Sequence, residues 1–406
     1  MKHRIILLLL VLFVYNKNTI AQYQQNDPII TTALSLINED SVEYQLQWLQ
    51  DMGTRFLMAP NHKNVALSIK SRFESYGITE VRLDSFECYT NINYSILHYD
   101  TTTWQYNVEA KIIGSTYPEE EILIMGHYDN VQLSSDPEIY SPGADDDGSG
   151  TVAVLETARV LMEMEYQPEM TIVFLATAAE ELMYFGDAGS EYYAQVAADE
   201  GRNITAVINN DMIAYDEGTS MIGFSNVIGS EEITGIASLI VSEYTTLTAD
   251  IPSPQSYSGA DLQPFLDEGY TGLYLEEHIF NPYYHTDQDL VENCDISYLT
   301  EVIKISCGSV LYSDIHVGTD EFSANDIGLS LFPNPCTDNL SITFSGLSKK
   351  CTVSLLNNAG QLVTSNDINP TYQNILNINL EEFPSGIYVV RLVSEYGVIS
   401  KKVIHN

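Results

Sequence analysis

The chain has 406 residues, enough for two or three domains of ordinary size and a sizeable hydrophobic core. Hydrophobic residues make up 45% and charged residues 18%, which is typical of a globular protein and not of a disordered one. The 17 basic and 56 acidic residues give a net charge of −39, which argues against a protein that binds nucleic acid or anionic lipid.

The N-terminus has the pattern of a signal peptide. Lys2 and Arg4 precede the apolar run 5–14, and small residues lead up to a cut after Ala21. Ten apolar residues are too few to span a bilayer, because its hydrocarbon core is about 30 Å thick and a helix rises about 1.5 Å per residue. We therefore expect residues 1–21 to be removed on secretion, and we expect no transmembrane segment afterwards.

Between residues 22 and 315, strand-like and helical segments alternate. Apolar runs that fit buried strands occur at 121–125, 171–176, 204–208 and 271–275. Residues 149–166 place apolar side chains on one face of a helix, and a second helix is predicted over about 291–311. This alternation predicts an α/β fold with a doubly wound, mostly parallel sheet, whose active site lies beyond the carboxyl ends of the strands.

Histidine and acidic side chains follow these strands or stand in the loops between them. They are His127, Asp129, the three aspartates Asp145, Asp146 and Asp147, then Glu180, Glu181, Asp211 and His285. Imidazole and carboxylate are ligands that zinc accepts, and two divalent cations that share a bridging carboxylate need about five such ligands. Two adjacent glutamates can supply one ligand and one general base from a single strand end. The pattern therefore predicts a metal site with a base beside it.

Five short motifs in this region resemble the secreted zinc aminopeptidases of peptidase family M28, in order and in spacing. The resemblance runs from about Val108 to His285 and implies the zinc exopeptidase fold, with two Zn²⁺ per chain. The motifs are GHYD at 126–129, PGADDDGSG at 142–150, AAEE at 178–181, NND at 209–211 and NPYYHT at 281–286.

The resemblance also implies a role for each metal ligand. His127 and Asp211 would bind one zinc, Glu181 and His285 would bind the other, and Asp146 would bridge them. Asp146 is chosen among three consecutive aspartates because it stands three residues before a Ser-Gly pair, as the bridging residue of the family does. Its two neighbours either contribute to the site or only shape and cap the loop before the helix.

Three further residues would act beside the metals. Glu180 would be the general base, and Asp129 would orient the imidazole of His127. Tyr284 would stabilise the oxyanion, as a tyrosine does in some members of the family. The stretch Ala260-Asp261-Leu262 departs from the family, which often has Ser-Asp-His there, so the substrate side chain stays open.

The function that follows is a secreted, metal-dependent exopeptidase. We expect an aminopeptidase that removes residues from peptides with a free N-terminus, using a hydroxide held by two zincs. Three alternatives remain at this point: a glutaminyl cyclase-like enzyme with a single zinc, a carboxypeptidase, and a non-catalytic surface binding protein on a peptidase fold.

The segment 329–406 differs from the rest in charge and pattern. It has five basic and five acidic residues, and its short β-branched runs are separated by turns, which predicts a small β-sandwich. Motifs such as LFPNP at 331–335 and PSGIY at 384–388 resemble the C-terminal sorting domain of type IX secretion. The resemblance implies contact with that machinery and export across the outer membrane, to the medium or the cell surface. The alternative is a carbohydrate-binding or adhesive domain, and 316–328 would be a linker.

Overall fold

The structure, a computed structural model, describes residues 27–182, 188–257 and 259–315. In the C-terminal part it describes residues 329–337, 339–344, 351–357, 362–368, 375–381, 383–394 and 397–405. The chain divides into two compact units, Met1–Ile315 and His316–Asn406. The expected signal peptide, 1–21, and the expected linker, 316–328, lie outside the described residues.

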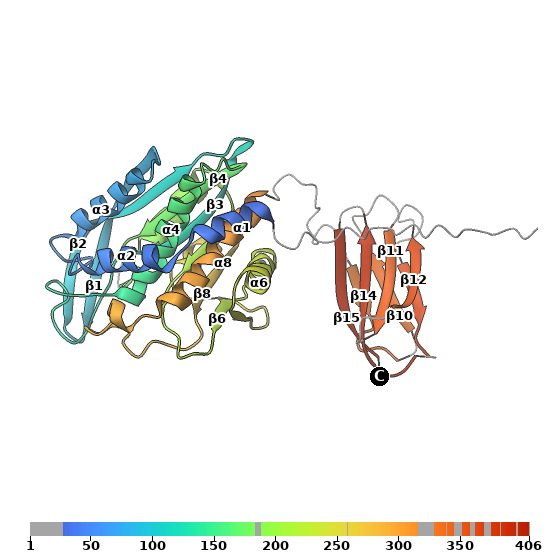
Figure 1. Ribbon diagram of the computed structural model, residues 1–406. Coiled ribbons are helices and arrows are strands. Elements are labelled where there is room, and N and C mark those ends of the chain that lie inside the picture. Colours follow the sequence, from blue (N-terminus) through green and yellow to red (C-terminus); the bar gives the residue numbers. More distant parts are fainter. Residues whose placement is uncertain are drawn as a thin grey trace, which may run out of the picture. The chain divides into compact units, whose positions relative to one another are not determined.

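The first unit is built on an eight-stranded sheet with the order β1-β2-β4-β3-β5-β8-β6-β7 (Figure 1). Its four central strands, β4, β3, β5 and β8, run parallel, and the long hairpin of β1 and β2 is added antiparallel at one edge. All eight residues of β4 are buried, as expected for a strand that is covered on both faces. The strands are β1 (Glu80–Tyr94), β2 (Leu97–Ile112), β3 (Tyr117–His127), β4 (Met170–Thr177), β5 (Asn203–Asn210), β6 (Met221–Ser225), β7 (Thr248–Asp250) and β8 (Gly272–Glu277).

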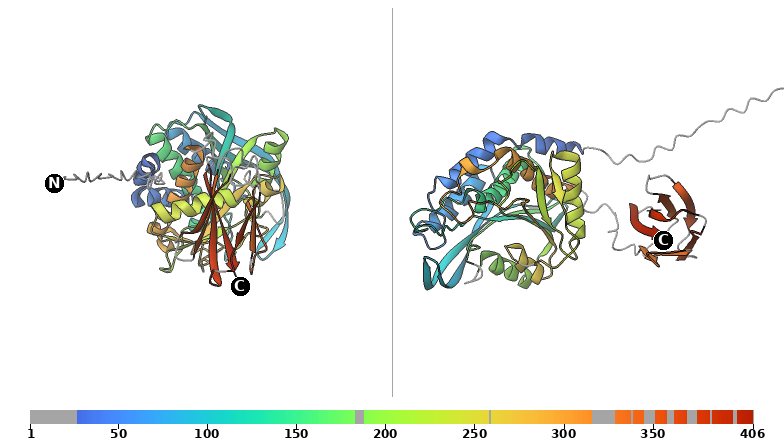
Figure 2. Two further views of the ribbon diagram at one scale, coloured as in Figure 1. Left: turned by 90° about the vertical axis from the view of Figure 1, so that its right-hand side faces the viewer. Right: turned by 90° about the horizontal axis from the view of Figure 1, so that it is seen from below.

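Helices cover both faces of this sheet, as the view from below in Figure 2 shows. α4 (Gly150–Glu163) and α8 (Ile296–Ile315) contact β3 on one face, while α7 (Leu262–Asp267) contacts β5 and β8 on the other. The other helices are α1 (Pro28–Leu36), α2 (Glu39–Gln50), α3 (His62–Ser75), α5 (Gly189–Asp199) and α6 (Glu231–Tyr244).

The predicted fold class is confirmed: a sheet with a parallel centre lies between two layers of helices. The helix predicted from 291 is instead divided into a 3₁₀ turn, Val291–Asn293, and α8. The break has a local cause, because the Asp295 side chain accepts a hydrogen bond of 2.9 Å from the Tyr298 N–H and caps the new helix. The β1–β2 hairpin was not predicted.

The second unit contains two antiparallel sheets, with the orders β13-β10-β9 and β12-β11-β14-β15. Apolar side chains of both sheets share one core, for example Leu340 and Ile342 with Val353 and Leu355. The predicted small all-β domain is therefore confirmed. Its strands are β9 (Leu329–Phe332), β10 (Asn339–Phe344), β11 (Cys351–Asn357), β12 (Leu362–Ile368), β13 (Ile375–Asn379), β14 (Gly386–Ser394) and β15 (Gly397–His405).

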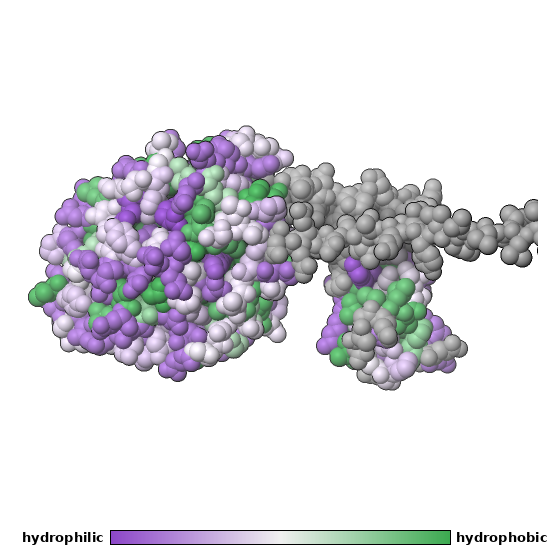
Figure 3. All heavy atoms as spheres, viewed as in Figure 1, coloured by the Kyte–Doolittle hydropathy of each residue, from purple (hydrophilic) through white to green (hydrophobic). Residues whose placement is uncertain are grey.

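The outer surface of the first unit is mostly hydrophilic on the face drawn in Figure 3, and its apolar side chains form small separate patches. This distribution agrees with a chain in which acidic residues greatly outnumber basic ones. Among the helices of the described residues, none combines the length and the hydrophobicity that a membrane crossing needs.

Candidate metal centre

The candidate site lies at the carboxyl ends of three neighbouring parallel strands. β3 lies between β4 and β5, and it ends at His127. Glu180 and Glu181 follow the end of β4, and Asp211 follows the end of β5. Because parallel strands all end at the same edge of the sheet, these side chains converge there.

Two glycines allow the loop before α4 to come close to these strand ends. A Cβ atom on Gly150 would lie 2.2 Å from the Asn210 carbonyl oxygen, and one on Gly126 would lie 2.6 Å from the Gly150 carbonyl carbon. Both distances are too short for any side chain at these positions. The glycines therefore let the first turn of α4 pack against β3 and β5, which carries residues 145–147 into the site.

Two of the three consecutive aspartates, Asp145 and Asp147, accept hydrogen bonds that fix the surrounding loops. The Asp145 carboxylate accepts hydrogen bonds from the Ala214 N–H at 2.8 Å and from the Asn281 side-chain amide at 2.7 Å. The Asp147 carboxylate accepts the Gly150 N–H at 2.7 Å, at the start of α4. Both side chains are fully buried, and their oxygens are occupied by donors from neighbouring loops. They shape the loop.

Asp146 alone faces both histidines. Its Oδ1 lies 3.4 Å from Nε2 of His127, and its Oδ2 lies 3.2 Å from Nε2 of His285. Asp146 Oδ2 and His285 Nε2 are also buried without a hydrogen-bond partner. Buried polar atoms are rarely left without one, so these two atoms point to an absent ligand between them.

The remaining predicted ligands lie on either side of this carboxylate. Glu181 Oε2 is 2.8 Å from Nε2 of His285, while its Oε1 accepts the Val131 N–H at 2.8 Å. Asp211 Oδ1 is 3.6 Å from Nε2 of His127, and its Oδ2 accepts a hydrogen bond of 3.3 Å from the Tyr274 hydroxyl. Each outer carboxylate therefore keeps one oxygen toward the site, and a second group holds the other oxygen.

The donor set fits a divalent metal. Ligand atoms of His127, Asp146 and Glu181 lie within 4.8 Å of one another, and so do those of His127, Asp147 and Asp211. Asp147 is the weaker candidate in the second group, because its oxygens already accept backbone N–H groups. Imidazole and carboxylate ligands with unpartnered atoms between them suit zinc.

The charges in the site have a large effect on its pKa values. Burial by itself would lower the pKa of His285, but Glu181 and Asp146 outweigh it and raise the pKa to about 11. Burial and the Asp146 carboxylate raise the pKa of Glu181 to about 7. Burial would raise the pKa of Asp146, but its interactions with the two nearby histidines hold it well below its usual range. Without a cation, the site therefore holds protons that a bound metal would displace.

Glu180 lies beside this group without a close contact to it. Its Oε2 is 3.8 Å from Nε2 of His127. Burial, with the nearby Asp211 and Asp261 carboxylates, raises its pKa well above the usual value, although His127 acts in the opposite direction. A carboxylate in this environment binds a proton more strongly than an exposed glutamate does.

Asp129 lies beside the His127 ring, and its backbone is closer to that ring than its carboxylate. The His127 Nδ1 atom is 3.1 Å from the backbone carbonyl oxygen of Asp129 and 3.7 Å from its carboxylate. A carbonyl oxygen only accepts, so Nδ1 carries the hydrogen and Nε2 of the neutral ring keeps its lone pair for a metal. The carboxylate instead accepts the N–H groups of Glu180 and Glu181, at 3.1 and 3.3 Å.

Tyr284 lies at the rim of the site. Its ring stacks on His285, with ring centroids 3.7 Å apart and an interplanar angle of 19°. Its side chain is 38% exposed, and Phe280 packs against the other side at 5.0 Å. Burial and the Asp146 and Glu181 carboxylates raise the pKa of Tyr284. Its hydroxyl therefore stays protonated at neutral pH and can donate a hydrogen bond.

Three residues of the site loops have left-handed backbone conformations that non-glycine residues rarely adopt. They are Ala179 with φ of 62°, Met212 with φ of 52°, and His285 with φ of 55°. Ala179 precedes Glu180, and Met212 follows Asp211. Such strain persists only where the surroundings enforce it, and it is concentrated at functional sites.

Arg55 is a residue of the site that the sequence pattern did not reveal. Its fully buried guanidinium donates to four backbone carbonyls: Tyr128 at 2.7 Å, Pro142 at 2.8 Å, Gly143 at 2.6 Å and, more weakly, Leu49 at 3.5 Å. It therefore ties the loop after β3 to the loop that carries Asp146. Burial lowers its pKa to about 10, against the opposing effect of the nearby carboxylates, and it remains a cation at neutral pH.

Asp289 was also missed, although it stands only four residues after His285. Its carboxylate accepts the N–H of Asp145 at 2.9 Å and that of Asp146 at 3.0 Å. The residue therefore fixes the backbone of Asp146 from the opposite loop. His278, another histidine near the site in sequence, instead lies 3.3 Å from the Asp250 carboxylate, the last residue of β7.

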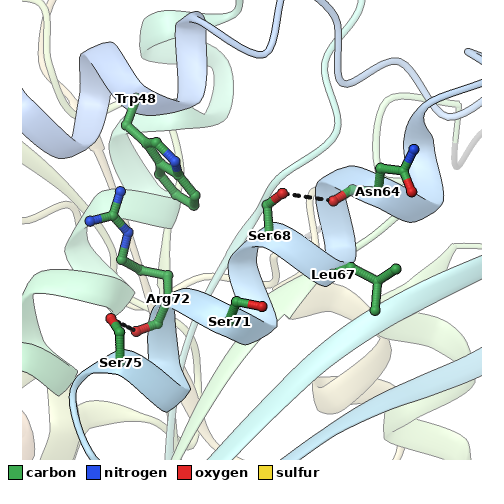
Figure 4. A pocket seen from close by; sticks show the side chains of 7 residues that line it. All are labelled: Trp48, Asn64, Leu67, Ser68, Ser71, Arg72 and Ser75. Atoms are coloured by element: carbon green, nitrogen blue, oxygen red, sulfur yellow. Dashed lines mark hydrogen bonds between the residues drawn. The ribbon is translucent and has the colours of Figure 1, made fainter.

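A groove on the outside of the first unit has a different composition. It has a volume of about 550 Å³ and lies between α2 and α3, where Arg72 stacks 4.1 Å above the Trp48 ring (Figure 4). Its lining has no histidine, cysteine or carboxylate, so it offers none of the ligands of the candidate centre. The lining residues are Trp48, Asn64, Leu67, Ser68, Ser71, Arg72 and Ser75.

Comparison with known families matches both parts of the chain. Residues 107–310 match Peptidase family M28, and residues 330–406 match the Secretion system C-terminal sorting domain. The second match indicates export. A relative in Saccharomyces cerevisiae, named Probable aminopeptidase YDR415C, is 28% identical over 227 residues, which cover 53% of this chain and 60% of that protein. The chain therefore matches less than two thirds of this relative's length.

Solved structures share the fold of the first unit. A zinc aminopeptidase from Bacillus subtilis is 15% identical, with a TM-score of 0.56 over 68% of this chain and 95% of that one. A glutaminyl cyclase from Porphyromonas gingivalis is 19% identical, with a TM-score of 0.56 over 68% and 99% of the two chains. At these identities the likeness concerns the fold, and it does not separate the two activities.

Proposed function

The chain belongs to peptidase family M28, and on this basis we propose that it is a secreted dizinc aminopeptidase. The observation that carries the proposal is the position of Asp146, whose two oxygens face the two histidines from opposite sides. This is the arrangement that a carboxylate needs to bridge two metals. A glutaminyl cyclase with a single zinc would need only one of these two oxygens as a ligand.

In the proposed centre, His127 and Asp211 would hold one zinc, Glu181 and His285 would hold the other, and Asp146 would be shared. Bound zinc supplies Lewis-acid polarisation of a carbonyl oxygen and lowers the pKa of a water molecule. The unpartnered atoms of Asp146 and His285 support this assignment.

The side chains around the metals would perform the proton transfers. Glu180 accepts a proton from the attacking water and later returns it to the nitrogen of the departing amine. Its raised pKa suits both steps. Tyr284 donates a hydrogen bond to the oxyanion, and the His127 ring is oriented by the carbonyl of Asp129.

The proposed organisation of the chain combines its two matches with the signal-peptide pattern at its N-terminus. Residues 1–21 would be the signal peptide, 22–315 the peptidase domain, 316–328 the linker and 329–406 the sorting domain. The sorting domain would hand the protein to the type IX secretion machinery. The substrate would be a peptide with a free N-terminus.

Two measurements on the purified full chain test the function: zinc content, and turnover of a panel of aminoacyl-anilides. We expect two zincs per chain and release of aniline that a chelator abolishes. One zinc with cyclisation of an N-terminal glutamine peptide would indicate the cyclase. Removal of residues from the other peptide end would indicate a carboxypeptidase, and two zincs without any hydrolysis would indicate a binding protein.

A further inference from the structure

Glu276 lies next to a proposed zinc ligand on the neighbouring strand. β5 and β8 are parallel, with Asn210 opposite Leu275. The Asp211 N–H donates to the Leu275 carbonyl oxygen at 3.2 Å, which continues the ladder by one residue and sets Asp211 opposite Glu276. Neighbouring strands are about 4.8 Å apart and opposite residues point to the same face, so the two carboxylates lie side by side.

The aromatic side chains around Asp211 support the placement of Asp211 and Glu276 on the same face of the sheet. Tyr274 stands two residues before Glu276 and therefore points to the same side of β8. Its hydroxyl donates to Asp211 Oδ2 at 3.3 Å, and the Tyr257 ring packs against it with centroids 5.5 Å apart. Glu276, Tyr274 and Asp211 therefore lie on the same face of the sheet.

The Glu276 carboxylate is available to a ligand. The residue is exposed, and within the described part of the chain its carboxylate forms no hydrogen bond or ion pair. On its other side, Gly223 of β6 lies opposite Glu276. Glycine has no side chain, whereas a Cβ atom at this position would lie only 3.2 Å from the Glu276 Cγ. The neighbouring strand therefore leaves room beside the carboxylate.

Cations for this pair of carboxylates are lacking in the surrounding protein. Among the described lysines and arginines, none forms an ion pair with Asp211 or Glu276, and Arg55 donates to backbone carbonyls. Two carboxylates side by side repel each other, and zinc on Asp211 leaves Glu276 as the outer, uncompensated charge. A cation from outside is the group that this position would attract.

We infer that Glu276 makes the enzyme selective for lysine or arginine at the N-terminus of its substrate. The inference rests on the proposed aminopeptidase function and names its substrate class. The reacting carbonyl and the α-ammonium group must lie at the metals, whereas Glu276 is on β8, two strands from His127 on β3 and thus about 10 Å across the sheet. A long basic side chain would bring its charge to that carboxylate.

The test compares anilides of arginine, lysine, leucine and glutamate on the zinc-loaded full chain. We expect kcat/KM for arginine and lysine to exceed that for leucine by about tenfold or more. Glu276→Gln should lower kcat/KM for the basic substrates by about tenfold or more, mainly through KM, and change that for leucine by less than about threefold. Glu268→Gln, which removes the same charge from an exposed residue after α7, is the control and should change neither.

Binding of free L-arginine, measured by calorimetry, is a second readout that needs no turnover, and Glu276→Gln should weaken it about tenfold or more. If the native chain hydrolyses leucine anilide as well as the basic ones, or if Glu276→Gln affects all four substrates alike, the inference is overturned while the aminopeptidase stands. If none of the four anilides is hydrolysed, the proposed function falls, and this inference falls with it.

Discussion

The Asp129 carboxylate accepts the backbone N–H of Glu180 at 3.1 Å, although the two residues follow different strands. The same carboxylate accepts the N–H of Glu181 at 3.3 Å. One side chain after β3 therefore fixes the backbone of both the proposed base and a proposed ligand after β4. This support matters because the turn enters Glu180 through the left-handed conformation of Ala179.

Replacing Asp129 by alanine should therefore lower the activity more than the zinc content. We expect kcat to fall by about 10- to 100-fold, because Glu180 and Glu181 lose their common acceptor while the carbonyl of residue 129 still orients His127. Steady-state kinetics and zinc content would be measured together. A variant with unchanged kcat would show that the carboxylate does not position the base.

Glu180→Gln should separate metal binding from chemistry. Glutamine keeps the size of the side chain but cannot accept the proton of the water, so activity should fall by about two or more orders of magnitude. Zinc content should stay near that of the native chain, since Glu180 makes no close contact with the ligand atoms. Normal turnover in this variant would remove Glu180 from the mechanism.

Asp146→Ala should weaken the binding of both zincs together, because the two oxygens of Asp146 face the two histidines. Asp211→Ala removes a proposed ligand that does not bridge, and it should mainly weaken binding of the zinc beside His127. Zinc retained per chain at a series of chelator concentrations distinguishes the two patterns. Loss of a single zinc from the Asp146 variant would assign the bridge to another residue.

Zinc binding should release protons. In the metal-free protein the pKa of His285 is raised to about 11 and that of His127 well above its usual value, so both rings are protonated at neutral pH. A raised histidine pKa stabilises the metal-free fold fully below about pH 6.5, and this contribution is lost as the pH rises toward 11. We expect about two protons to leave per chain at pH 7 to 8, and zinc affinity to rise with pH.

Calorimetry in buffers of different ionisation enthalpy measures this proton release directly. The observed heat of zinc binding should vary linearly with the buffer's ionisation enthalpy, and the slope gives the number of protons. A heat that is the same in every buffer would contradict the charge state inferred for the two histidines.

Arg55→Lys should weaken zinc binding although the residue contacts no proposed ligand. Lysine keeps the charge but cannot span the four carbonyls, so the loops after β3 and before α4 lose their tie. We expect about a tenfold loss of zinc affinity, and a lower melting temperature of the metal-free chain because buried carbonyls lose donors. Arg72→Lys, in the groove of Figure 4, is the matched control and should leave zinc affinity unchanged. Unchanged zinc affinity in Arg55→Lys would limit Arg55 to a structural role.

Much of the fold could be predicted because its signals are local. The four central strands are continuous apolar runs, and the helix over 149–166 has one apolar face; both patterns follow from burial of neighbouring residues. The β1–β2 hairpin escaped prediction because half of its surface is exposed and its strands are unusually long. The proposed ligands could be named because each directly follows a strand or stands in a short motif.

The residue types of the centre and their order along the chain are properties of the sequence, and so is the two-part organisation. The different roles of Asp145, Asp146 and Asp147 are not a property of the local sequence. They depend on which group contacts each carboxylate: Asn281, the two histidines, or the start of α4. Arg55 and Glu276 carry no local signal for the same reason. Their roles arise from neighbours far away in the chain, which only packing and strand register bring together.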